Sequence, residues 1–191
     1  MTSHTFRVPG ALAALVVALG LTVSACNDPF SGFLLDVPDT PSDAMLFDFE
    51  TGRLQDPSAF DVVGNTVARP DQTTQWDFVF RIVNGFGQLL PFSALTDSLH
   101  EAGLIKATMS FEEVLSAPDE GYEQQSAVAI TEGDVFIVRS RRDRTQFLIC
   151  SQYMKMEILE IDLEAGTLML RYLRNPNCGD QVLQPGMRGS L

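Results

Sequence analysis

Side chains that could carry out catalysis are few in this chain, and their spacing does not fit the common catalytic motifs. His100 begins the stretch His100-Glu101-Ala102-Gly103-Leu104. A zinc-protease helix needs a second histidine at the position of Leu104. The chain also has no G-x-S-x-G sequence of the kind that presents a nucleophilic serine. The sequence therefore predicts no catalytic residue and no metal ligand, and we interpret His100 as a solvated helix residue.

Charged residues form several local clusters. Acidic pairs occur at Glu112-Glu113, Asp119-Glu120 and Glu157/Glu160. Two carboxylates about 5–10 Å apart can hydrolyse glycosides, but the ordinary use of such pairs is a solvated acidic surface. Four arginines gather around Asp143, namely Arg139, Arg141, Arg142 and Arg144. We interpret them as a polar hairpin loop paired with surface acids. The alternative is an anion-binding tip, because guanidinium groups pair with carboxylates and phosphates.

Two further motifs resemble cofactor sites only in part. Gly85-Phe86-Gly87 begins like a dinucleotide-binding loop, but the third glycine is missing, and a hairpin explains it better. Met154 and Met156 alternate with Ile158. Thioethers can ligate haem iron, yet methionine usually serves core packing, and we expect these residues in the core.

The strongest motif with a chemical consequence is Val23-Ser24-Ala25-Cys26. It closes an apolar run over residues 11–22, and Arg7 precedes that run, as in a secretory signal peptide. A bilayer-spanning helix needs about 20 apolar residues, so this run is short for a span. The four residues resemble the lipobox of bacterial lipoproteins. The resemblance implies that Cys26 is lipidated and becomes the first residue of the mature chain.

The other two cysteines, Cys150 and Cys178, are 28 residues apart. An exported chain meets compartments that permit disulfides, and a bond between them would be worth about 3 to 4 kcal/mol in the chain-entropy model. Two free thiols or a metal pair are the alternatives. Metal is disfavoured because no C-x-x-C and no neighbouring histidine is present.

Composition and length divide the chain into four parts. Residues 1–25 are the expected signal peptide, 26–43 a flexible tether, 44–178 a single globular domain, and 179–191 a frayed tail. Without Arg7 the chain has 12 cationic residues against 25 acidic ones, which is a net charge near −13. So acidic a chain is a poor partner for nucleic acid.

Hydrophobic alternation predicts a β-rich α+β fold with a largely antiparallel, meandering sheet and one short helical insert. The clearest strand spans 75–83, with Trp76, Phe78, Phe80 and Ile82 on one face, and Asn84-Gly85 then forms a turn. Helices are expected after Ser93, ending at Gly103, and from a capping box of Ser110 and Glu113 to Pro118. Further strands are expected at 44–49, 126–130, 134–141, 146–150, 152–161 and 167–173.

Several pieces in order resemble the HmuY-type haem-binding lipoproteins. They are the lipobox, a hairpin at 47–54, Trp76-Asp77-Phe78-Val79-Phe80 with Asn84-Gly85 behind it, Ser116-Ala117-Pro118, and Leu170-Arg171-Tyr172. The resemblance implies a β-rich fold on the outer membrane and, in its members, haem held by two histidines. After residue 25 only His100 is available, so no haem ligand is assigned and no cofactor is expected. A Met–Met or His–Met pair would be needed instead.

Two function classes follow from the sequence. The first is a lipid-anchored envelope protein that binds a small, hydrophobic ligand. The second is a surface lipoprotein that docks an envelope protein partner and has no small-molecule ligand. Asn27 after the lipidated cysteine favours the outer over the inner membrane, because aspartate there is the inner-membrane signal. An apolar pocket lined by Trp76, Phe78 or Met154 would favour the first class, and an exposed apolar patch the second.

Overall fold

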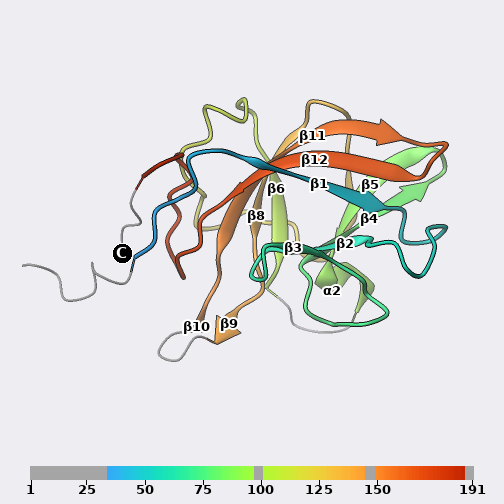
Figure 1. Cartoon of the computed structure of the whole chain (residues 1–191), viewed down its shortest axis with the longest axis horizontal. Helices are drawn as coiled ribbons and strands as arrows, with labels where there is room; N and C mark the ends of the chain where they lie inside the picture. Colours follow the sequence, from blue (N-terminus) through green and yellow to red (C-terminus); the bar gives the residue numbers. More distant parts are fainter. Residues whose placement is uncertain (1–33, 97–100, 145–148, 188–191) are drawn as a thin grey trace, which may run out of the picture. The chain divides into compact units, whose positions relative to one another are not determined.

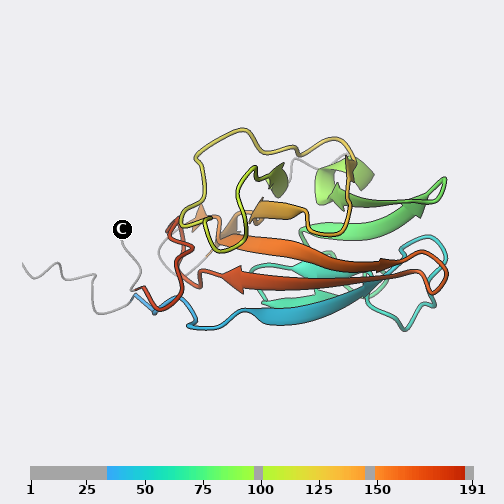
Figure 2. The ribbon, with the colours of Figure 1, turned by 90° about the horizontal axis from the view of Figure 1, so that it is seen from above.

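The computed structural model describes residues 34–96, 101–144 and 149–187, and they fold into two five-stranded antiparallel sheets (Figures 1 and 2). The first sheet has the order β1 (Ser42–Phe47), β12 (Thr167–Arg174), β11 (Tyr153–Asp162), β8 (Val135–Arg139) and β6 (Gly103–Lys106). The second has the order β3 (Thr66–Ala68), β2 (Ala59–Asp61), β4 (Phe78–Val83), β5 (Phe86–Pro91) and β7 (Val128–Ala129). A two-stranded ladder joins β9 (Asp143–Arg144) to β10 (Ile149–Cys150). The predicted β-rich, antiparallel fold class is confirmed.

The main core lies between the two sheets. Phe78 and Phe80 of β4 and Met154, Met156 and Ile158 of β11 belong to it, and each is at most 1% exposed. The apolar residues that alternate along β4 and β11 therefore face the core between the two sheets. The expected core role of the two methionines is confirmed.

Both outer faces are also covered. A second apolar cluster, with Phe111, Val114 and Leu183, packs on the outside of the first sheet. A third, with Trp76, Val79 and Phe92, covers part of the second sheet. Strands such as Phe78-Val79-Phe80 are apolar on both faces because both faces of the sheet are covered.

Trp76 does not share the face of Phe78 and Phe80, so that part of the prediction is wrong. β4 begins only at Phe78, and the two residues before it leave the strand alternation. The Trp76 ring packs against Phe92, with ring centroids 4.4 Å apart. Asp77 turns instead to Arg141.

Tight hairpins connect the long strands. β4 and β5 meet at Asn84-Gly85, whose φ angles of 53° and 79° are the left-handed pair that a two-residue hairpin needs. The interpretation of Gly85–Leu90 as a hairpin rather than a dinucleotide loop is therefore confirmed.

The helical predictions fare less well. The described helix is α2 (Phe92–Leu95), a single turn. Gly103 does not end a helix but opens β6, and His100 lies outside the described residues. No helix follows Ser110, although its N–H and Oγ both reach Glu113 Oε2, at 3.0 and 2.8 Å. The capping box forms locally, but the chain then packs Phe111 and Val114 onto the first sheet.

Both predicted domain boundaries need correction. The tether was expected to continue to residue 43, yet Val37 is 1% exposed and its N–H donates to Met187 O at 2.9 Å. The tail was expected to fray from residue 179, yet Leu183 is fully buried and Val182 bridges Ser116. The two terminal segments hydrogen-bond to each other and pack on the first sheet. The folded domain therefore begins by residue 35 and continues to residue 187.

Candidate functional site

A buried ionic cluster links the two sheets. The Arg141 guanidinium lies 2.8 Å from Asp61 Oδ1 and 3.2 Å from Asp77 Oδ2, through Nη1 in both cases. Asp61 ends β2, and Asp77 lies just before β4, whereas Arg141 follows β8 of the other sheet. Of the arginines expected to form a polar loop, Arg141 is therefore buried, whereas Arg142 forms an exposed pair with Glu101.

Asp77 is the most strongly perturbed carboxylate of this cluster. Burial raises its pKa to about 6, against the opposing effects of Arg141 and of two backbone N–H donors. Those donors are Arg141 N at 2.6 Å and Val62 N at 2.7 Å. Asp61 and Asp77 thus share the guanidinium of Arg141, and Asp77, with a pKa of about 6, changes charge near that pH.

Next to this cluster the surface has a shallow, open depression. Its lining residues are mostly polar and come from β2, β3 and the loop before β4: Pro57, Asp61, Thr66, Val67, Ala68, Arg69, Gln72, Thr73 and Gln75. Asp61 and Gln75 contact Arg141 from the side of the cluster. The depression could accept a polar molecule, but Trp76, Phe78 and Met154 do not line it because they are buried.

The β1–β2, β4–β5 and β11–β12 connections lie at one end of the sandwich, on the right in Figure 1. They are joined there, because the N–H of Phe49 donates to Phe80 O at 2.9 Å and the N–H of Asp48 donates to Gly166 O. Exposed apolar residues lie in or beside these connections. We call this end the hairpin-tip face and define it by Phe49, Leu54, Phe86 and Leu163, with exposures of 37, 77, 70 and 51%.

Asp48 holds these loops together. Its carboxylate accepts hydrogen bonds from the N–H groups of Thr51 and Ile82, at 3.2 and 2.8 Å. Its own N–H donates to Gly166 O at 2.8 Å. Although the side chains of the hairpin-tip face are exposed, the backbone that carries them is fixed by these bonds.

The rim of the hairpin-tip face is acidic. Glu132, Asp162 and Glu164 lie in its turns, and none of the three forms an ion pair with a described residue. Apolar side chains inside an acidic rim would suit a partner surface that is apolar with basic residues around it.

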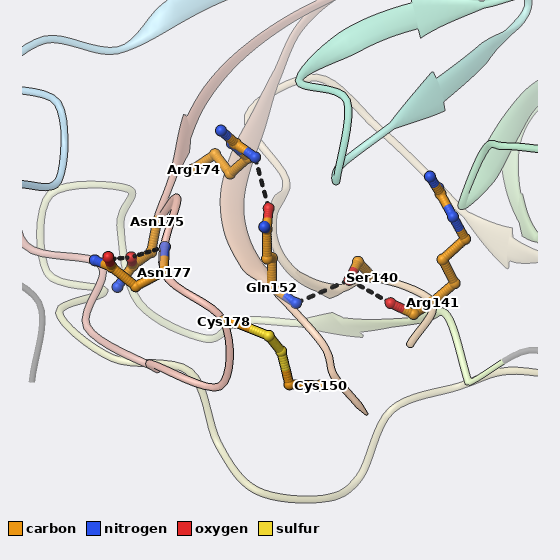
Figure 3. The surroundings of a disulfide bond; sticks show 8 residues. All are labelled: Ser140, Arg141, Cys150, Gln152, Arg174, Asn175, Asn177 and Cys178. Atoms are coloured by element: carbon orange, nitrogen blue, oxygen red, sulfur yellow. Dashed lines mark hydrogen bonds between the residues drawn. A yellow bond between two sulfur atoms is a disulfide. The ribbon is translucent and has the colours of Figure 1, made fainter. Parts of the chain in front are cut away.

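The opposite end of the sandwich holds the disulfide and the entry of the chain. Cys150 and Cys178 are joined, with Cα atoms 5.6 Å apart, as the sequence analysis expects (Figure 3). Beside them, Asn177 pairs its side-chain amide with the backbone of Leu35, with both bonds at 2.8 Å. The point at which the chain enters the domain is therefore fixed, and the predicted lipid site Cys26 lies outside the described residues.

Lys155 is a buried cation that the sequence analysis did not single out. Its Nζ donates to the carbonyls of Phe111 and Val114, both at 2.8 Å, and lies 4.7 Å from the centre of the Phe111 ring. Arg171 packs over the same ring, 4.5 Å from its centre. Burial lowers the pKa of Lys155. This arrangement fastens the 110–117 segment to the first sheet, and we assign it a structural role.

The described residues contain no group of three or more acids, cysteines or histidines placed to hold a metal ion. Within the same ranges, no helix has the length and hydropathy required to cross a bilayer. Comparison with known protein families, curated proteins and solved structures finds no match for this chain.

Proposed function

We propose that the chain is a lipid-anchored envelope protein that docks a partner protein through its hairpin-tip face. The observation that carries this proposal is that the exposed residues Phe49, Leu54, Phe86 and Leu163 lie in or beside the connections at the end of the sandwich opposite the chain entry. Exposed apolar side chains held on a fixed backbone, with a polar rim around them, are typical of interaction surfaces.

The anchor gives the proposed surface a direction. Eight residues lie between Cys26 and Leu35, and the nine steps from Cα to Cα reach at most about 30 Å when fully extended. Lipid attached at Cys26 would leave the entry end near the membrane. The hairpin-tip face then points away from the bilayer, toward a partner with an apolar patch and basic neighbours.

Site-directed photocrosslinking in intact cells tests the docking surface. A benzophenone amino acid at position 86 should give a discrete crosslinked product, and the substitution Leu54→Glu in the same chain should abolish it. The matched control is the same probe at Met109, which is also exposed, at 49%, but lies outside the face. Equal products from positions 86 and 109, or a product insensitive to Leu54→Glu, would contradict the proposal.

Membrane fractionation tests the anchor separately. The variant Cys26→Ser should leave the membrane fraction or remain unprocessed, because it lacks the thiol that takes the lipid. A variant that is processed and membrane-bound like the unchanged chain would contradict lipidation.

A small-ligand function is the second candidate, and the depression beside Asp61 and Gln75 is the observation that favours it. Polar side chains such as Asp61, Gln72 and Gln75 line it and could hydrogen-bond to a ligand that carries polar groups. Native mass spectrometry of the protein purified from its source would show a retained ligand as an added mass. Loss of that mass in Gln75→Ala would place it in the depression.

A further inference from the structure

Arg174, the last residue of β12, is a half-buried cation without an acidic partner among the described residues. Its Nη1 donates to the carbonyls of Val62 and Val63, at 3.3 and 2.9 Å, and to Gln152 Oε1 (Figure 3). Burial lowers its pKa, and Asp61 attracts it only through space. No hydrogen bond to a described residue uses its Nε or Nη2.

Arg174 also lines a small pocket. The pocket walls are Pro38, Thr40, Ser42, Asn65, Tyr172, Leu173, Arg174 and Pro176. Its volume is about 50 Å³, and since one water takes about 30 Å³ in the liquid, only a small group can enter. Besides the guanidinium, the walls carry three hydroxyl side chains, Thr40, Ser42 and Tyr172, and the side-chain amide of Asn65.

We propose that this pocket binds a phosphate group. A guanidinium with two unused N–H directions fits two oxygens of a phosphate at once. The hydroxyls of Thr40 and Ser42 and the amide of Asn65 can donate to its remaining oxygens, which suits a tetrahedral anion better than a flat carboxylate. The bound charge would compensate the guanidinium, which the protein leaves unpaired.

The position of the pocket connects it with the membrane. Pro38 and Thr40 closely follow Leu35, at the end where the chain enters the domain. Eleven residues lie between Cys26 and Pro38, and the twelve steps from Cα to Cα span at most about 40 Å. A lipid headgroup could therefore supply the phosphate, as could free phosphate in solution. This step rests on the proposed anchor, whereas phosphate binding by the pocket does not.

Calorimetric titration of the full chain in detergent with inorganic phosphate tests the site, whether or not Cys26 carries lipid. Arg174→Gln should weaken phosphate binding at least about tenfold, as expected for loss of a charge-assisted pair. Asn65→Gly removes one donor and should weaken binding less. Its positive φ of 53° makes glycine acceptable there, so folding is preserved. The matched control Arg53→Gln, an exposed arginine paired with Asp56, should leave the affinity unchanged.

A second arm identifies the source of the phosphate. The lipidated chain is placed in vesicles of a galactolipid, which contains no phosphate, with either phosphatidic acid or oleic acid added at equal surface charge. It is then titrated with inorganic phosphate. Weaker phosphate binding with phosphatidic acid alone would mean that a headgroup occupies the pocket. Equal binding in both vesicles would assign the pocket to free phosphate.

Absence of phosphate binding to the unchanged chain would overturn the proposal. So would affinities for Arg174→Gln and Asn65→Gly that equal that of the unchanged chain. Because Cys26→Ser is measured by fractionation alone, failure of the anchor would leave the result of the phosphate titration in detergent unaffected.

Discussion

Replacing Asp77 by asparagine should change how the stability of the fold depends on pH. Burial raises the pKa of this carboxyl from 3.8 to about 6, so the folded state keeps the proton that the unfolded chain releases. Stability from this group is complete below pH 3.8 and is lost as the pH rises through 6. The full difference corresponds to about 3 kcal/mol, and about 2.5 kcal/mol of it falls between pH 4 and 7.5.

The measurement compares urea unfolding of the unchanged chain and of Asp77→Asn across that pH range. Asparagine cannot titrate, so the free energy of unfolding of the variant minus that of the unchanged chain should rise by about 2.5 kcal/mol with pH. A constant offset is expected as well, because the amide nitrogen replaces one carboxylate oxygen and meets the backbone N–H that donated to it, either that of Val62 or that of Arg141. Only the slope tests the reasoning.

Asp134→Asn serves as a control of opposite sign. Partial burial works against ionisation of Asp134, but hydrogen bonds from Lys106 and from Thr131 outweigh it and lower its pKa. Stability from Asp134 is therefore complete above pH 3.8 and is lost as the pH falls below it. The corresponding difference should stay nearly flat between pH 4 and 7.5 and decline with rising pH only below that range. A flat difference for Asp77→Asn would refute the argument, because it would mean that the N–H donors and Arg141 keep Asp77 ionised despite its burial.

Three further outcomes are expected. Thiol labelling of the denatured, unreduced protein should find neither Cys150 nor Cys178 free, and reduction should cost about 3 to 4 kcal/mol of unfolding free energy for the 28-residue loop. Phe80→Ala should lower the unfolding free energy by about 3 to 5 kcal/mol, since the ring is fully buried between the sheets; an unchanged urea midpoint would argue against this. Titration with haem should give no low-spin spectrum, because Met154 is fully buried in the core. A tight one-to-one haem complex lost on mutation of His100 or Met154 would reverse that view.

The sequence predicts the strands better than the segments that cover them. Predictions that rest on local or covalent constraints agree with the structure. They are the alternation of Phe78 and Phe80, the turn at Asn84-Gly85 and the bond between the two cysteines. Lys155 shows why the rest could not be found. Because its neighbours Met154 and Met156 face the core, alternation along the strand would point the Lys155 side chain toward solvent. Phe111 and Val114, which lie 44 and 41 residues earlier in the chain, cover that face of the strand instead.

The ionic cluster was missed for a similar reason. Asp61, Asp77 and Arg141 lie in three separate segments, and only the packing of the two sheets brings them together. The clustering of Arg141 with three other arginines pointed to a surface loop instead. Arg141 ends the predicted strand 134–141, and this was the one available signal, but it does not specify a partner. No strand was predicted around Asp61.

The two ends of the sandwich also have a mechanical consequence. If the membrane holds the chain at Leu35 and a partner holds the hairpin-tip face, tension runs lengthwise along β1, β12 and β11. The hydrogen bonds between antiparallel strands are perpendicular to the strands, so the six paired positions of β1 and β12 are loaded in shear and share the force. Such a protein would resist being pulled from its partner far better than one whose strands could be peeled apart one bond at a time.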